Sequence, residues 1–73
     1  MRKFAKRLVI FFVRKRLKLK KHEEFRFANQ KSNATYWFTT YTVMKRLNNK
    51  CFLSSVSLNF LLSEECVIEK VDA

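Results

Sequence analysis

The chain contains neither glycine nor proline in 73 residues. Tight turns normally use glycine for a positive φ and proline for a fixed φ, so this chain has to turn with other residues. Asparagine tolerates positive φ best among those that remain. The predicted turn positions are therefore Asn29, Asn33, Asn48 and Asn49. The lack of glycine also excludes a glycine-rich phosphate-binding loop of the nucleotide-binding kind.

Positive charge is concentrated at the amino terminus. Ten of the 16 Lys and Arg residues lie within residues 1–21, which hold no acidic residue, whereas residues 22–73 hold six basic and six acidic residues. A charged block beside a neutral, aromatic-rich body is typical of a surface that meets a polyanion. The sequence therefore predicts that residues 1–21, termed the basic segment below, contact nucleic acid or another acidic surface.

Size and composition predict one folded domain over residues 1–73. Hydrophobic residues make up 48% of the chain and aromatic residues 15%, which is too apolar for a disordered protein despite the net charge of +10. A domain of this length buries only about 60% of its unfolded surface, so a homodimer or a bound partner would help to stabilise it. The apolar run at residues 8–13 is too short to cross a bilayer and precedes no cleavage site, so we expect a cytoplasmic location.

The basic segment is predicted to be an amphipathic helix. On a helical wheel, eight of its ten basic residues share one half with Ile10, Val13 and Leu17. A strand through residues 8–20 is the alternative, because β-branched residues and an alternating pattern also occur there. The apolar half of the wheel holds Phe4, Ala5, Leu8, Val9, Phe11, Phe12 and Leu19.

After residue 24 the hydrophobic pattern alternates, which predicts antiparallel sheet over residues 24–71. Residues 35–44 and 54–62 are predicted to form a hairpin around a two-residue Asn48-Asn49 turn. In that register one face is apolar and the other carries mostly hydroxyl groups. The apolar face pairs Trp37 with Phe60, Thr39 with Leu58, Tyr41 with Val56 and Val43 with Ser54, whereas the hydroxyl face pairs Thr40 with Ser57 and Thr42 with Ser55.

These elements predict an α+β fold, an N-terminal basic amphipathic helix packed on a small antiparallel β-meander of three to four strands. Residues 66–71 would add the third strand, and residues 25–28 a fourth strand at an edge. The helix is expected to bury its apolar half against the sheet and to leave its basic residues outside. The predicted contacts join Phe4, Leu8, Phe11 and Phe12 to Trp37, Tyr41, Val56, Leu58 and Phe60.

Catalytic and metal-binding chemistry find little support in the sequence. His22 is the only histidine, and the fifteen-residue separation of Cys51 and Cys66 is no zinc spacing. The pairs Glu23-Glu24 and Glu64-Glu65 are neighbours in sequence and would point to opposite faces, so they do not resemble a paired acid and base. We therefore expect no enzyme activity, no cofactor, no metal and two reduced, part-buried thiols.

The function that the sequence favours is non-enzymatic binding of RNA or DNA, dominated by phosphate contacts and with weak sequence preference. Like charges four residues apart along the predicted helix repel one another, and phosphates would relieve that repulsion. Tyr36 and Phe38, on the predicted hydroxyl face, are the candidate stacking or partner-contact residues. The predicted contact set is Arg2, Lys3, Lys6, Arg7, Arg14, Arg16, Lys18, Lys20 and Lys21.

Two other functions are compatible with the same charge pattern. An inhibitor or adaptor would place its basic face on an acidic surface of another protein, such as a nucleic-acid enzyme. By analogy alone, viruses and mobile elements use small basic proteins in this way. The basic segment could instead lie on an anionic membrane. The membrane is the less favoured partner, because the apolar side of the helix is expected to be buried against the sheet.

Overall fold

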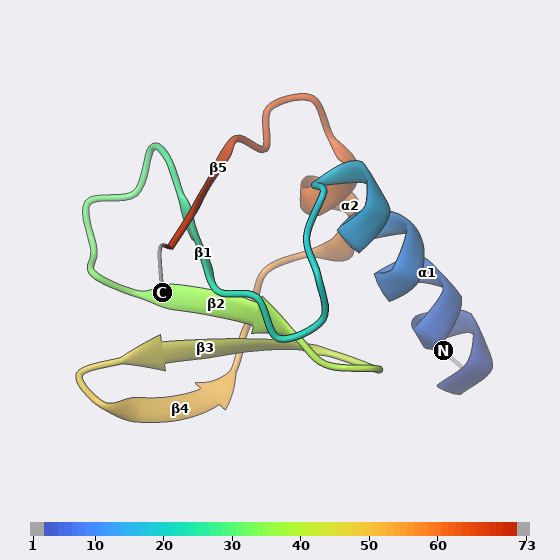
Figure 1. Ribbon diagram of the computed structural model, residues 1–73, viewed down its shortest axis with the longest axis horizontal. Helices are drawn as coiled ribbons and strands as arrows, with labels where there is room; N and C mark the ends of the chain where they lie inside the picture. Colours follow the sequence, from blue (N-terminus) through green and yellow to red (C-terminus); the bar gives the residue numbers. More distant parts are fainter. Residues whose placement is uncertain (1–2, 72–73) are drawn as a thin grey trace.

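The computed structural model describes residues 3–71, with side chains of helix α1 (Lys3–Arg16) from Ala5 onward. The fold is α+β, as predicted, and combines two helices with a five-stranded antiparallel sheet. The sequence had predicted three to four strands. Helix α1 and the short helix α2 (Leu58–Leu62) lie side by side at one end of the molecule (Figure 1). The strands are β1 (Phe25–Phe27), β2 (Thr35–Phe38), β3 (Val43–Leu47), β4 (Lys50–Leu53) and β5 (Ile68–Lys70).

The strand order β4-β3-β2-β1-β5 places β1 inside the sheet. Phe25 of β1 pairs with Tyr36 of β2 on one side and with Lys70 of β5 on the other. The predicted edge position of residues 25–28 is therefore wrong, because the C-terminal strand returns to cover that edge. The free edges of the sheet belong to β4 and β5.

The Asn48-Asn49 turn is confirmed. Both residues have positive φ, 53° and 65°, and they join β3 to β4 as a two-residue hairpin loop. The ladder pairs Leu47 with Lys50 and Met44 with Leu53, which is the predicted register. A hydrogen bond of 2.9 Å from Ser54 N to Val43 O continues that register by one further pair.

Beyond that pair the predicted hairpin is wrong, because residues 35–44 form two strands rather than one. The chain reverses between Thr39 and Thr42, where Thr39 N donates to Thr42 O at 2.9 Å and Thr42 N donates to Thr39 Oγ1 at 3.2 Å. Threonine hydroxyls can close a turn locally without glycine or asparagine. As a result β2 pairs with β3, and Trp37 lies opposite Met44 instead of Phe60.

Residues 54–62 are a loop and helix α2 instead of a strand. Ser57 is the N-cap of α2, and its Oγ accepts a hydrogen bond from Asn59 N at 3.1 Å. Leu61 is fully buried and belongs to the core. The alternating serines concealed a short helical pattern in Leu58, Leu61 and Leu62, which are three and four residues apart.

The two faces of β2 are exchanged relative to the prediction, whereas Val43 of β3 is buried as predicted. Phe25, Tyr36 and Phe38 are at most 1% exposed, and the Phe25 ring lies 5.8 Å from the Tyr36 ring and 5.5 Å from the Phe38 ring. Trp37 is only half-buried and Tyr41 is 44% exposed. Because residues 54–62 leave the sheet and place Leu61 in the core, the covered face is the one that carries Tyr36 and Phe38. These two rings are therefore unavailable for stacking on bases.

Ile10 and Val13 of helix α1 lie in the core, and Leu17 is half-buried beside them. The core already holds three large aromatic rings, and these compact residues complete a close-packed interior. Of the wider apolar half that was predicted to be buried, Val9 is half-buried against the core and Leu19 is buried, but the three largest described side chains face solvent. The side chain of Phe4 lies outside the described part. The exposed fractions are 43% for Leu8, 53% for Phe11 and 59% for Phe12.

Helix α1 ends at a left-handed residue that is not glycine. Lys18 has a φ of 57°. Lys18 N donates to Lys15 O at 3.2 Å and Leu19 N donates to Arg14 O at 2.9 Å, the hydrogen bonds of a Schellman cap. Leu19 is buried beyond the cap. His22 also has positive φ, and its N–H donates to Phe38 O at 3.1 Å. The sequence signals for positive φ at asparagine missed both of these positions.

The Lys18→Gly substitution is expected to raise the free energy of unfolding by about 0.5–1 kcal/mol. Glycine removes the steric cost of the left-handed conformation, although it also gives the unfolded chain more freedom. Lys20→Gly is the control. Lys20 has no positive φ, so this variant should be less stable than the unaltered protein. Urea unfolding compares the two variants, and a loss of stability in both would contradict this account of the cap.

Candidate functional site

The described cations of the basic segment, from Lys6 to Lys21, are not paired with carboxylates. Among the residues that the structure describes there are two ion pairs, Arg46–Glu24 at 2.8 Å and Lys70–Glu23 at 3.9 Å. Their cations belong to β3 and β5. Within residues 5–21, no Lys or Arg side chain forms an ion pair with a carboxylate. The positive charge of the basic segment therefore remains available to a partner.

Three of these cations surround one cleft between α1 and the loops that face it. Arg7 and Arg14 are seven residues apart on α1 and so lie on one side of the helix. Lys21 follows the helix, and Thr40 comes from the turn between β2 and β3. This cleft, termed the basic cleft, has a volume of about 230 Å³ and no carboxylate in its lining. The lining residues are Arg7, Ile10, Phe11, Arg14, Lys21 and Thr40.

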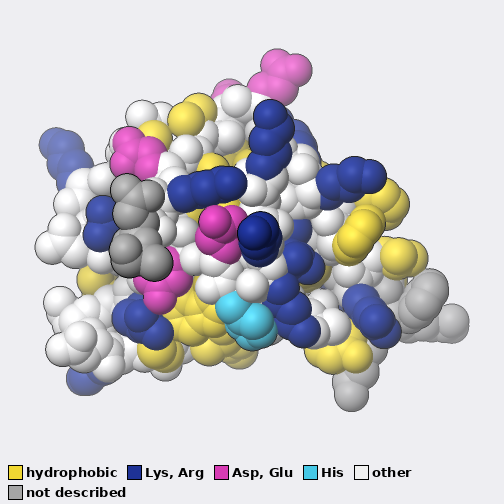
Figure 2. Space-filling view, in the orientation of Figure 1, with side chains coloured by type: hydrophobic (Ala, Val, Ile, Leu, Met, Phe, Trp, Pro, Cys, Tyr) yellow, Lys and Arg dark blue, Asp and Glu magenta, His cyan; other side chains and the backbone are white. Residues whose placement is uncertain are grey.

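The surface around the basic cleft is strongly cationic. Figure 2 shows Lys and Arg side chains over the part of the molecule that carries α1 and the loop after it, with apolar side chains exposed among them. Acidic side chains on this face lie mostly over the sheet and α2. Lys and Arg side chains also lie over the sheet, but acidic side chains accompany them there, so the excess of positive charge is at the α1 end (Figure 2).

Arg14 gives the basic cleft its clearest unsatisfied group. Its Nε is buried and has no hydrogen-bond partner among the described residues. A buried charged donor without an acceptor costs free energy, and native structures rarely keep one. Arg14 also lines the basic cleft, where the apolar walls formed by Ile10 and Phe11 would strengthen its attraction to an anion by lowering the local dielectric constant.

The other predicted contact residues have different surroundings. The Arg16 guanidinium donates to Ser63 O at 2.9 Å and to Leu61 O at 3.4 Å, so it fastens α1 to the C-terminal end of α2. Lys18 forms the helix cap and is exposed, as is Lys20. Lys6 lines a separate hollow beside the turn between β2 and β3. Arg2 and the side chain of Lys3 lie outside the described residues.

Two aromatic residues near these cations were assigned to the core from the sequence. Phe11 lines the basic cleft, and Tyr41 lines the same hollow as Lys6, of about 90 Å³. Recognition of the Thr39–Thr42 turn would have placed Tyr41 at the tip of a hairpin and therefore on the surface. Lys15 was left out of the predicted contact set, yet it is exposed on the outer side of α1.

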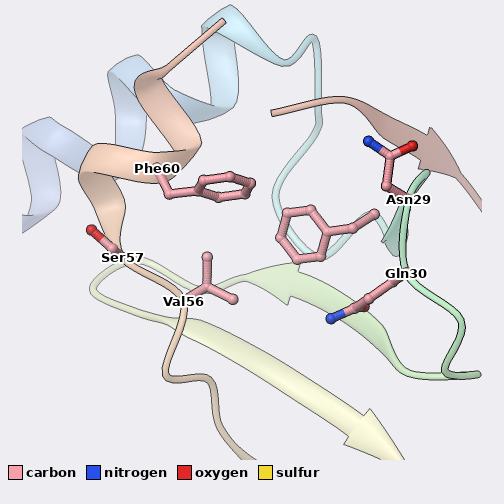
Figure 3. A pocket seen from close by; sticks show the side chains of 6 residues that line it. Asn29, Gln30, Val56, Ser57 and Phe60 are labelled. Atoms are coloured by element: carbon pink, nitrogen blue, oxygen red, sulfur yellow. The ribbon is translucent and has the colours of Figure 1, made fainter. Parts of the chain in front are cut away.

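A second cleft of about 320 Å³ lies away from these cations, between α2 and the segment after β1 (Figure 3). Phe60 and Phe27 face each other there, with ring centroids 5.9 Å apart. Two of its polar side chains already have partners. Gln30 Nε2 donates to Tyr36 Oη at 3.2 Å, and Ser57 caps α2. No charged residue lines this cleft, so it does not extend the cationic surface.

Metal and thiol chemistry add no second site. Between residues 3 and 71, no three His, Cys, Asp or Glu side chains lie close enough to hold a metal ion. Both cysteines are free, with Cys51 exposed and Cys66 buried, and burial raises the pKa of the Cys66 thiol. The exposure of Cys51 corrects the expectation of two part-buried thiols. In the same part of the chain, no helix is long and apolar enough to cross a membrane.

Comparisons with protein-family models, with curated proteins and with solved structures gave no match in any of the three. Function is therefore inferred from the chemistry of the chain itself. The inference rests on the basic cleft and on the cations of residues 5–21, which form no ion pair with a carboxylate.

Proposed function

We propose that this protein is a small non-enzymatic cytoplasmic protein that binds RNA or DNA mainly through phosphates. The observation that carries the proposal is the convergence of Arg7, Arg14 and Lys21 on a cleft that contains no carboxylate. Arginine presents donors that match two oxygens of a phosphate at once, and lysine adds a compact charge.

We expect the affinity of the protein for nucleic acid to depend little on the base sequence. Phosphate contacts position a protein on nucleic acid but carry no base information. Two exposed aromatic residues lie near the cations, Tyr41 next to Lys6 and Phe11 in the wall of the basic cleft. A ring of this kind accepts any base by stacking, which contributes about 1–3 kcal/mol per base. We therefore expect dissociation constants of about 10⁻⁶–10⁻⁴ M at physiological salt for unrelated sequences.

Purification without nuclease tests this function against docking on an acidic protein. We expect nucleic acid to copurify with the protein at low salt and to leave it at high salt, as an ultraviolet absorbance spectrum would show. A pull-down from nuclease-treated lysate should then retain no stoichiometric protein. A protein partner retained after digestion, together with no nucleic acid at low salt, would contradict the proposal and favour the inhibitor or adaptor function.

A further inference from the structure

The solvent-facing side of α1 is apolar, although helices in water normally expose polar residues there. Leu8, Phe11 and Phe12 are 43%, 53% and 59% exposed, and they fall within about a third of the helical wheel. The rings of Phe11 and Phe12 pack edge to face at 5.8 Å. We term these three residues the outer stripe. Because Ile10 and Val13 are buried on the other side, α1 has two apolar faces and the fold covers only one of them.

Cations lie within and beside the outer stripe. Lys15 lies between Leu8 and Phe11 on the helical wheel, and Arg7 and Arg14 lie next to Phe11. The described helix contains no acidic residue. Figure 2 shows the apolar side chains at the α1 end of the molecule among Lys and Arg side chains. A second copy of this chain would bring like charges together around the stripe, which disfavours self-association and favours an apolar partner with an anionic surface.

We propose that α1 docks on the surface of an anionic membrane. Leu8, Phe11 and Phe12 enter the boundary between headgroups and acyl chains, and Arg7, Arg14 and Lys15 contact lipid phosphates. The helix lies in the plane of the interface and does not span the bilayer, because it has only 14 residues. The sequence disfavoured a membrane because this side of the helix was expected to be buried, and its exposure removes that objection.

This inference goes beyond nucleic-acid binding and uses partly different residues. Arg7 and Arg14 also border the basic cleft, so nucleic acid and anionic vesicles should compete for the protein. Leu8 and Phe12 do not line that cleft. Substitutions at these two positions therefore separate the two activities.

The test is cosedimentation of the full chain with phosphatidylcholine vesicles, with and without phosphatidylserine, at physiological salt. Leu8→Gln/Phe12→Gln is expected to lower partitioning onto the anionic vesicles by roughly 10- to 100-fold, because it removes the inserting apolar area. Its nucleic-acid affinity should stay unchanged. Phe52→Gln/Leu53→Gln is the matched control, since these exposed β4 residues offer the same pair of residue types away from α1. It should bind vesicles like the unaltered protein.

Three results would overturn the proposal. The first is equal partitioning of the unaltered protein and Leu8→Gln/Phe12→Gln, since the contact would then be electrostatic without insertion. The second is equal binding to neutral and anionic vesicles. The third is a dimer in the absence of vesicles that Leu8→Gln/Phe12→Gln dissociates, which would assign the outer stripe to a second copy.

The conservative Phe12→Trp variant supplies a readout that survives if the double variant fails to fold. An indole that enters the lipid boundary shifts its fluorescence to shorter wavelength when anionic vesicles are added. The expected result is that shift with anionic vesicles and little change with neutral ones, after subtraction of the emission of Trp37 measured in the unaltered protein. Unchanged emission at a lipid concentration where the protein sediments with the vesicles would also overturn insertion.

Discussion

Replacement of Arg7, Arg14 and Lys21 together by glutamine is expected to weaken nucleic-acid binding about 100-fold at a moderate salt concentration of about 0.1 M, because each charge-assisted contact contributes about 1 kcal/mol or more. These side chains converge on the basic cleft, where no carboxylate competes for them. Glutamine keeps much of the side-chain length and some hydrogen-bonding capacity but removes the charge. Fluorescence anisotropy with a labelled single strand and a labelled duplex measures the change.

The matched control is Arg26→Gln/Lys31→Gln/Lys50→Gln, which removes the same number of charges from exposed positions outside the basic segment. Screening limits the influence of distant surface charges to about 10 Å at moderate salt. The control should therefore bind within a few-fold of the unaltered protein. Equal losses in the two triple variants would mean that net charge acts alone, and the basic cleft would lose its role.

The Phe38→Ala substitution is expected to remove about 3–5 kcal/mol from the free energy of unfolding, because it opens a cavity in the core. Phe38 is fully buried and stacks on Phe25 at 5.5 Å. Since native proteins are stable by only about 5–15 kcal/mol, this loss could unfold much of the sample at ambient temperature. Thermal unfolding followed by circular dichroism measures the effect.

Tyr36→Phe and Tyr41→Ala are the comparisons for this prediction. Tyr36→Phe removes a hydroxyl that pairs with Gln30 and should cost about 1 kcal/mol. Tyr41 is 44% exposed, and Tyr41→Ala should cost less than Phe38→Ala by about 2 kcal/mol or more. If Phe38→Ala melted like the unaltered protein while Tyr41→Ala did not fold, the predicted sheet faces would be correct and the observed faces wrong.

The parts of the fold that the sequence could predict depended on local chemistry. Two adjacent asparagines favour positive φ, and they set both the turn between β3 and β4 and the register of that hairpin. The basic segment was expected to be helical, and it is helical as far as Arg16. A turn or a helix of this kind is determined by residues within a few positions, so the sequence signal is direct.

The sheet faces could not be predicted because they depend on where residues 54–62 pack. Their alternating serines matched a strand, but Ser57 caps α2 and Leu61 enters the core. Thr39 and Thr42 close a turn that contains no glycine, proline, asparagine or aspartate. Once the long strand was divided there, Tyr36 and Phe38 faced the core and Tyr41 faced solvent.

The sequence identified most of the residues of the candidate site, but it could not show which of them lie close together. The sequence identified the basic segment, and the structure leaves its described cations without carboxylate partners. Arg7, Arg14 and Lys21 converge because of the path that the chain takes after α1. The positive φ of Lys18 and of His22 sets that path. The sequence also could not show which apolar face of α1 is buried, because both faces carry large apolar residues. The tertiary structure shows that Ile10 and Val13 are buried.

The salt dependence of nucleic-acid affinity tests the central claim most directly, namely that unpaired cations of the basic segment bind phosphates. A plot of log K against log salt concentration for duplex DNA should have a slope of about −4 to −7, which corresponds to about five to eight phosphate contacts. Loss of Arg7, Arg14 and Lys21 should bring the slope about 3 units closer to zero. A slope near zero for the unaltered protein, or a slope that this triple variant leaves unchanged, would contradict the claim.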